Sequence, residues 1–269
     1  PAGRNKEMDK MKIEQVQMIC FSGTGTTRAV AQAVAQGTGL PVKEWDCLPQ
    51  RANAPFQPDE HTLTILAVPS FGGRAPAPMA QRLEQMKGCG PVVLLSVYGA
   101  RASEDTLVEL YDLAEKTGYQ PIAAGEFVAR HSIATRIAAH RPSEDDLAQA
   151  RELGKQALEL AEGLAPGARP VLEIPGNRPY KKFGGSAAHP LASDACVECG
   201  RCADQCAVGA IPAENPRETD HTVCITCMRC VAVCPMQARS LPAAAQAATL
   251  EKLSKICDEN RANQTWLAR

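Results

Sequence analysis

The spacing of eight cysteines near the C-terminal end constrains the fold of this chain more than any other feature. Twelve of the 269 residues are cysteine, and eight of the twelve fall between Cys196 and Cys234. We do not expect a disulfide scaffold, because the chain is large and shows no export signal. Cysteines clustered in this way indicate metal binding.

The eight cysteines form an internal repeat. The pattern Cys-x2-Cys-x2-Cys-x3-Cys begins at Cys196 and recurs 28 residues later from Cys224, where Pro235 follows the last cysteine. The same shift superposes Arg201 on Arg229. A pair of zinc sites is the alternative. A zinc site needs four ligands, however, and a pair of such sites would not explain a duplicated run of three evenly spaced cysteines.

The segment from Ser193 to Leu241 resembles the bacterial two-cluster ferredoxins over its whole length, with Ala207 where that family usually has proline. The resemblance implies two 4Fe–4S clusters that transfer single electrons, and in this pattern each fourth cysteine binds the other cluster. The first cluster would then be bound by Cys196, Cys199, Cys202 and Cys234, and the second by Cys206, Cys224, Cys227 and Cys230. Four other cysteines stand alone and are expected to be inert structural thiols, namely Cys20, Cys47, Cys89 and Cys257.

The stretch from 13 to 164 alternates short apolar runs with helical patterns, which is typical of a doubly wound α/β domain. We predict parallel strands at 16–21, 42–45, 62–68, 91–97 and 121–127, helices at 27–38, 78–86, 103–117 and 143–163, and coil at 46–61. Ser143 and Asp146 fit a capping box at the start of the last of these helices.

Two further segments complete the chain. A linker rich in proline, glycine and lysine is expected over 165–192, before the cysteine-bearing domain at 193–241. An amphipathic C-terminal helix is expected over 242–269. Its apolar positions are Leu250, Leu253, Ile256 and Cys257.

A loop of hydroxyl and glycine residues follows the first predicted strand. It reads Ser22-Gly23-Thr24-Gly25-Thr26-Thr27 and leads into a helix, so its hydroxyls and backbone amides form a cradle for a phosphate. It has no lysine, which a Walker loop would need, and no G-x-G-x-x-G, which a dinucleotide site would need. NTP and NAD are therefore not the expected ligands.

Two aromatic loops follow the third and fourth predicted strands. Phe71 lies in the loop from Pro69 to Pro76, and Tyr98 lies in the loop that ends at Arg101. Ligands of open α/β sheets bind at the carboxyl ends of the strands. Two aromatic loops beside a phosphate loop suit a flat ring that carries a single phosphate, and FMN is such a molecule.

The three loops match those of flavodoxins, and the whole chain resembles the fused flavodoxin–ferredoxin electron-transfer proteins of anaerobes. The resemblance implies a flavodoxin-like sheet of five parallel strands that binds FMN, followed by a small α+β two-cluster ferredoxin domain. We also hypothesise that Arg74 or Arg101 is a cation beside the ring. The residues expected to bind FMN are Ser22, Thr24, Gly25, Thr26, Thr27, Pro69, Ser70, Phe71, Gly72, Gly73, Tyr98, Gly99 and Arg101.

We therefore predict an electron-transfer protein that passes single electrons between FMN and two 4Fe–4S clusters and on to a redox partner protein. No catalytic residue is required, and His131, after the fifth strand, is either a proton carrier or an ordinary loop residue. One alternative is an FMN-dependent reductase of a small substrate, supplied with electrons by the clusters. The other is a binding module with structural clusters and an empty phosphate loop.

Charge and hydropathy exclude several other functions. The formal net charge of −1 provides no basic field for nucleic acid or for an anionic membrane surface. The longest apolar runs are far shorter than the roughly 20 residues that span a bilayer. We expect no nucleic-acid partner, no membrane insertion and a cytoplasmic location.

Overall fold

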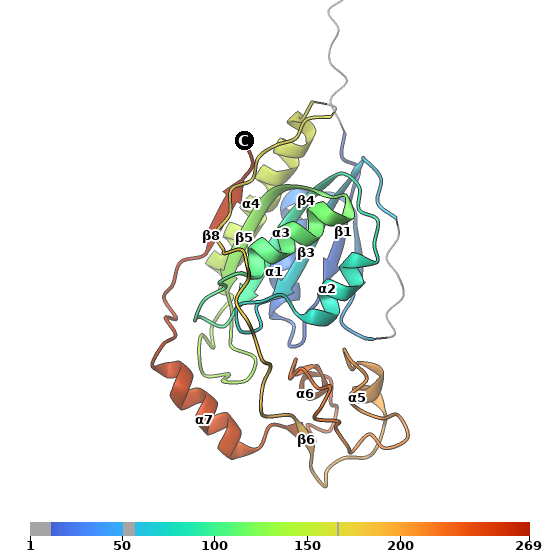
Figure 1. Cartoon of the computed structure of the whole chain (residues 1–269), viewed down its shortest axis with the longest axis vertical. Helices are drawn as coiled ribbons and strands as arrows, with labels where there is room; N and C mark the ends of the chain where they lie inside the picture. Colours follow the sequence, from blue (N-terminus) through green and yellow to red (C-terminus); the bar gives the residue numbers. More distant parts are fainter. Residues whose placement is uncertain (1–11, 51–56, 166) are drawn as a thin grey trace, which may run out of the picture.

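Figure 1 shows the fold as a computed structural model, which describes residues 12–50, 57–165 and 167–269. The first eleven residues, residues 51–56 of the predicted coil and residue 166 of the predicted linker lie outside the described residues. A layered α/β domain occupies the upper part of the view, and the cysteine-bearing segment lies below it.

A six-stranded sheet forms the centre of the α/β domain. The strand order is β2-β1-β3-β4-β5-β8, and the first five strands run parallel. The order β2-β1-β3-β4-β5 is that of flavodoxin-like doubly wound sheets. The strands are β1 Gln15–Cys20, β2 Val42–Asp46, β3 Thr62–Pro69, β4 Pro91–Tyr98, β5 Gln120–Val128 and β8 Gln264–Leu267.

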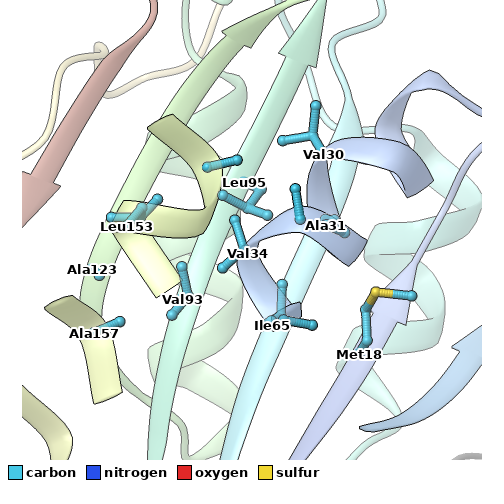
Figure 2. Packing of buried hydrophobic residues seen from close by; sticks show 14 of the residues in the cluster. Met18, Val30, Ala31, Val34, Ile65, Val93, Leu95, Ala123, Leu153 and Ala157 are labelled. Carbon is cyan, nitrogen blue, oxygen red and sulfur yellow. The ribbon is translucent and has the colours of Figure 1, made fainter. Parts of the chain in front are cut away.

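Helices cover both faces of this sheet. α1 (Thr26–Thr38) and α4 (Glu144–Gly163) cover one face, and α2 (Ala77–Glu84) and α3 (Thr106–Thr117) cover the other. Figure 2 shows Val34 of α1 and Leu153 of α4 packed over Val93 in the middle of the sheet. Since both faces are covered, β3 and β4 are buried along nearly their whole length, which explains their continuous apolar sequences.

The prediction of a sheet with five parallel strands is wrong in one respect, because β8 adds a sixth, antiparallel strand beside β5. The helix predicted over 242–269 is confined to α7, Ala243–Ser254. Beyond it the backbone bonds to the α/β domain, with Asp258 N–H donating to the Ala100 carbonyl (2.9 Å) and Ala268 N–H to the Ile122 carbonyl (2.8 Å). These bonds, which join residues far apart in the sequence, hold the last residues in an extended conformation.

The apolar face predicted for α7 is correct in part. Leu250, Leu253 and Cys257 pack against a buried cluster that includes Tyr98 and Ala100. Ile256 and Cys257 both lie beyond the end of the helix, and 51% of Ile256 is exposed. Within the described residues, no helix is both long enough and apolar enough to cross a membrane.

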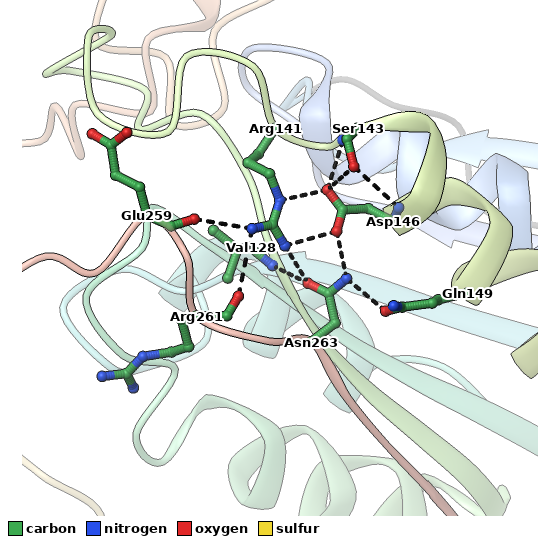
Figure 3. Close-up of polar contacts among 8 residues, drawn as sticks. All are labelled: Val128, Arg141, Ser143, Asp146, Gln149, Glu259, Arg261 and Asn263. Atoms are coloured by element: carbon green, nitrogen blue, oxygen red, sulfur yellow. Dashed lines mark hydrogen bonds and ion pairs between the residues drawn. The ribbon is translucent and has the colours of Figure 1, made fainter.

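A buried polar network joins the C-terminal segment to the start of α4 (Figure 3). Arg141 donates to both carboxylate oxygens of Asp146, at 2.5 and 2.7 Å, and to the carbonyl of Glu259 at 3.0 Å. Asn263 donates to Asp146 at 2.7 Å. Ser143 and Asp146 form the predicted capping box. The network therefore ties α4 to the residues that lead into β8.

The cysteine-bearing segment contains four short elements. β6 (Leu191–Ala192) pairs antiparallel with β7 (Arg239–Ser240), and between them lie α5 (Arg201–Asp204) and α6 (Arg229–Ala232). α5 and α6 begin 28 residues apart, as the sequence repeat requires. The backbone N–H groups of Ala210 and Ala238, also 28 residues apart, donate to Sγ of Cys206 and Cys234 at 3.2 Å each. The internal duplication is thus present in the structure as well as in the sequence.

Candidate functional site

The phosphate loop connects the end of β1 to the start of α1. Ser22 Oγ accepts a hydrogen bond from the backbone N–H of Arg28 at 3.2 Å, which closes the loop against the helix. In the described structure, the five consecutive backbone N–H groups from 23 to 27 donate to no protein atom. Free amides at the N-terminus of a helix carry partial positive charge and favour an anion.

The first aromatic loop is a tight turn held at both ends. Phe71 and Arg74 exchange two backbone hydrogen bonds, of 2.9 and 3.2 Å, across the Gly72–Gly73 turn. The Gly73 carbonyl accepts from the N–H of Asp105 at 3.0 Å. The Phe71 ring packs edge-on against buried Phe21, with ring centroids 6.4 Å apart. The loop is therefore positioned by the core rather than by a ligand.

The three predicted loops meet around one cavity of about 140 Å³. The structure brings to its wall eleven residues of these loops, namely Gly23, Thr24, Thr26, Thr27, Pro69, Ser70, Phe71, Gly72, Val97, Tyr98 and Gly99. Ser22, Gly25, Gly73 and Arg101 do not line it. Most of the residues predicted to bind FMN therefore share one site at the carboxyl ends of β1, β3 and β4.

The opposite wall of this cavity was missed by sequence reasoning. It consists of Ile225, Thr226 and Cys227 from the cysteine-bearing segment, and of Phe183 and Ser186 from the predicted linker. The contact is close at the phosphate loop, where a β-carbon on Gly23 would overlap the carbonyl oxygen of Cys227. Gly23 is thus required by the approach of the cysteine loop, and no local pattern in the sequence signals that approach.

The structure pairs both arginines considered as cations beside the ring with carboxylates. Arg74 donates to both carboxylate oxygens of Glu109, at 2.7 Å each, and Arg101 makes a similar pair with Glu104. The hydrogen bond from Arg101, helped by Lys181, lowers the pKa of Glu104 to about 2. Both guanidinium groups are neutralised by carboxylates, and neither lines the cavity.

Tyr98 is buried in the protein and does not have the exposed ring face that would stack on a ligand. Only 5% of the residue is exposed, and it packs with Val128 against Leu250 and Leu253 of α7. Burial raises the pKa of the Tyr98 hydroxyl. Tyr98 lines the cavity from β4 while it forms part of the base on which α7 rests.

The four cysteines assigned to the first cluster surround one small cavity. Cys196, Cys199, Cys202 and Cys234 line a space of about 20 Å³ together with apolar neighbours. This grouping includes the fourth cysteine of the second repeat, as the ferredoxin resemblance implies. Cys199 is exposed, and Val197 and Met236 beside the cavity are 61% and 49% exposed. One edge of this set therefore lies at the surface, while Cys202 is buried.

The four cysteines assigned to the second cluster also lie near one another. Burial raises the pKa of the Cys227 thiol to about 12, and the nearby thiols of Cys230, Cys206 and Cys224 contribute to the same shift. An electrostatic effect among all four thiols requires that they be close. Since Cys227 also contacts the phosphate loop, this second set faces the α/β domain.

Neither set forms a compact cage for a single ion. Across the described residues, no group of three or more His, Cys, Asp or Glu is arranged to hold a metal ion. The thiolates around an iron–sulfur cubane stand farther apart than the ligands of one ion, because iron and sulfide atoms lie between them. Metal binding therefore stays a prediction, based on the cysteine spacing and on the two groupings of thiols.

Side chains of both parts fix the second cysteine set against the α/β domain. Arg229 donates to the Ser22 carbonyl at 3.1 Å and to Asp46 Oδ2 at 2.6 Å. Arg82 of α2 donates to the carbonyl of Ala207 at 2.8 Å. The backbone N–H of Gln50 donates to the Cys206 carbonyl at 2.9 Å. The interface thus joins the residues around the second set directly to the phosphate loop.

The four isolated cysteines, which we predicted to be inert thiols, differ in their burial. Cys20 and Cys47 are fully buried, and burial raises the pKa of each thiol, which makes the reactive thiolate rare. Cys257 packs beneath α7, with its Sγ 3.5 Å from the Gly99 carbonyl. Cys89 is exposed, unlike a structural thiol packed in the core.

No protein-family model and no curated protein matches the sequence. Solved structures similar to this chain include a flavodoxin from the domain Archaea, with 13% identity and a TM-score of 0.42 over 55% of this chain and 98% of that one. A flavodoxin of Streptococcus pneumonia TIGR4 has 15% identity and a TM-score of 0.40 over 54% and 98%. A flavone reductase has 13% identity and a TM-score of 0.41 over 55% and 63%. At TM-scores this low the fold assignment rests on the strand order.

Proposed function

We propose that this protein transfers electrons between FMN in the α/β domain and two 4Fe–4S clusters in the cysteine-bearing segment, and on to a redox partner protein. The observation that carries the proposal is the shared cavity. The phosphate loop, the first aromatic loop and the cysteine loop around Cys227 all line it. A flavin in this position would be in contact with the backbone that holds one set of thiols.

The residues of the three loops fit FMN by their hydrogen-bond donors and by their position around one cavity. The five free amides from 23 to 27, with the hydroxyls of Thr24 and Thr26, would hold the phosphate at the start of α1. The cavity is smaller than the roughly 300–1,000 Å³ of small-molecule sites. The ring therefore needs additional space, and Phe183, a half-exposed side chain that packs over Gly72, lies where it can yield that space.

Bound FMN would supply chemistry that connects two-electron with one-electron transfer, and the clusters would supply one-electron transfer. The protein would position the clusters beside the flavin. The cysteine loop lines one side of the flavin cavity, while Arg229, Arg82 and Gln50 hold that loop in place. The first cysteine set lies on the exposed side, with Val197 and Met236 around it, so we expect the partner protein to dock there.

Spectra and a cofactor count of anaerobically purified protein test the proposal. We expect flavin absorption bands, broad thiolate-to-iron absorption, about one FMN and about eight iron atoms per chain. Protein with neither flavin nor iron would contradict the proposal and favour the binding module. Two zinc ions in place of iron would contradict the cluster assignment alone.

A charge placed in the phosphate loop should weaken FMN binding selectively. Thr24 is half-buried on the cavity wall, so Thr24→Glu brings a carboxylate to the amides that would hold the phosphate. We expect FMN affinity to fall by at least about tenfold, since like charges at such a site cost more than about 1.4 kcal/mol. Riboflavin has the same ring without the phosphate, and its affinity should not change. Equal losses for both flavins would contradict the assignment of this loop to the phosphate.

Replacement of Arg229 should loosen the docked cysteine segment. Arg229→Met removes charge-assisted bonds to Asp46 and to the Ser22 carbonyl, and each such bond contributes about 1.5–3 kcal/mol. A loss of about 2 kcal/mol shifts the docking equilibrium about thirtyfold, so transfer between flavin and clusters after a flash-induced reduction should slow. Arg201, at the matching position of the other repeat, is exposed and provides the control in Arg201→Met. Equal rates in both variants would contradict the docking role of Arg229.

A second, larger cavity favours the reductase as a second candidate function. It has a volume of about 740 Å³ and shares Phe71, Phe183, Ser186 and Ile225 with the wall of the flavin cavity. Its lining also includes Cys224, and this size is typical of small-molecule sites. A screen of electron acceptors tests this candidate. Ala80 lines this cavity but not the flavin cavity. Saturable turnover that is lost in Ala80→Trp while FMN stays bound would support a reductase, and turnover unaffected by Ala80→Trp would argue against it.

A further inference from the structure

His131 occupies a part of the flavin cavity that none of the three predicted loops supplies. It follows β5, and it lines the cavity next to Gly99 at the end of β4. The contact between the two residues is close, because a β-carbon on Gly99 would overlap the imidazole ring. Gly99 therefore allows the His131 ring to lie against the backbone of the second aromatic loop.

Hydrogen bonds determine which nitrogen of His131 carries the proton. Nδ1 accepts from the backbone N–H of Ile133 at 3.2 Å and from that of Ala134 at 3.0 Å. A ring nitrogen that accepts hydrogen bonds has no proton, so in the neutral imidazole the proton is on Nε2. Nε2 donates to no atom of the described residues. The side chain thus presents one free N–H donor.

The ring is fixed in position as well as in tautomer. The backbone N–H of His131 donates to the Ile137 carbonyl at 3.1 Å, which folds residues 131–137 into a closed loop. Ala134 and Ile137 of that loop are buried beside Tyr98. Rotation of the ring would break both bonds to Nδ1. The donor therefore needs no reorganisation when a ligand binds.

The environment keeps His131 uncharged near neutral pH. Burial lowers the pKa of the imidazole to about 4, and no charged side chain contributes to the shift. A second proton would have to be placed on Nδ1, where two backbone N–H groups already point. The role of proton carrier considered from the sequence is therefore not the one that this geometry supports.

We propose that His131 is a flavin-binding residue that donates a hydrogen bond from Nε2 to an acceptor atom, a carbonyl oxygen or a ring nitrogen, of the isoalloxazine ring. This inference rests on the proposed function. The ring rather than the phosphate is the partner, because His131 lies against the second aromatic loop, whereas the free amides lie at the start of α1. With Arg74 and Arg101 both neutralised by carboxylates, a neutral donor would stabilise charge on the ring.

Affinities of the flavin-depleted protein for FMN and for riboflavin, measured by quenching of flavin fluorescence, test the inference. We expect His131→Phe to weaken both flavins by the same factor of about five to ten, the effect of one hydrogen bond. His131→Gln retains an N–H donor and should recover much of the loss. His140→Phe, at an exposed histidine nearby, should change nothing. Wild-type affinity for riboflavin, which carries no titrating phosphate, should not change between pH 6 and pH 8.

Three results would overturn the role of His131. They are unchanged affinity in His131→Phe, a loss confined to FMN, and a wild-type affinity for riboflavin that varies with pH around 6.5 and ceases to do so in His131→Phe. Failure of the proposed function has a different signature. In that case the wild-type protein would bind neither FMN nor riboflavin.

Discussion

Alanine in place of Cys199 or of Cys227 is expected to halve the iron content of the protein, from about eight to about four atoms per chain. Each change removes one thiolate from one of the two sets, and a cluster that has lost a ligand is not retained. The effect on FMN binding should differ between the two variants. The Cys227 loop lines the flavin cavity and contacts Gly23, whereas Cys199 lies at the exposed end. We therefore expect weaker FMN binding in Cys227→Ala alone.

Iron analysis, electron paramagnetic resonance of the reduced protein and FMN affinity measure these outcomes. Cys89→Ala is the control, because Cys89 is an exposed thiol outside both sets and should leave iron and FMN unchanged. Full iron content in Cys199→Ala would contradict its assignment as a ligand. Equal FMN affinity in the Cys199 and Cys227 variants would contradict the position proposed for the second cluster.

The second large effect is expected from Asp146, at the centre of the network in Figure 3. Asp146→Ala leaves the Arg141 guanidinium buried without its carboxylate, and the side chains of the pair are 10% and 6% exposed. Removal of one partner of a buried ion pair costs about 3–5 kcal/mol. We expect the free energy of unfolding, measured by urea denaturation, to fall by this amount.

The contribution of the Asp146–Arg141 ion pair to stability should also be visible in its dependence on acid pH. Burial opposes ionisation of Asp146, but hydrogen bonds from Arg141, Ser143 and Asn263 outweigh it and lower the pKa of the carboxyl below the usual 3.8. A carboxyl with a lowered pKa stabilises the fold fully above its unfolded pKa, and the contribution is lost as the pH falls through the folded value. The stability gap between wild type and Asp146→Ala should therefore shrink below about pH 4.

Arg151→Ala is the control for Asp146, since its partner Glu144 is on the same helix and largely exposed. Exposed pairs contribute about 0–1 kcal/mol. A loss of similar size in Arg151→Ala and Asp146→Ala would show that burial of the pair has no special effect.

The strands and helices up to residue 164 were predictable because their signals are local. β3 and β4 are continuous apolar runs between turn residues, and the capping box at Ser143 is a pattern of four residues. β8 was not predictable. It is four residues long and mostly exposed, and its conformation comes from hydrogen bonds to β5, which lies more than a hundred residues earlier in the sequence.

The candidate site likewise has features that were predictable from the sequence and features that were not. The three loops were located from the sequence because a doubly wound sheet places the ends of its strands along one edge. The carboxylate partners of Arg74 and Arg101 were not predicted. Glu109 is on α3, 35 residues after Arg74, and Glu104 follows Arg101 by three residues in the loop before α3. The tautomer of His131 depends on two backbone N–H groups, and only the folded loop brings these to Nδ1.

The position of β8 determines how far the cysteine-bearing segment can move. After α4 the chain stays on the α/β domain as far as Lys181, whose backbone N–H donates to Asp105, and it returns to this domain at Asp258, whose N–H donates to the Ala100 carbonyl. The cysteine-bearing segment is therefore an insertion anchored at both ends. A tail with one anchor can swing through a wide volume, whereas an insertion with two anchors can only hinge open. A segment that undocks therefore stays within reach of its docking surface, and a single cut in the linker would leave both parts in one particle.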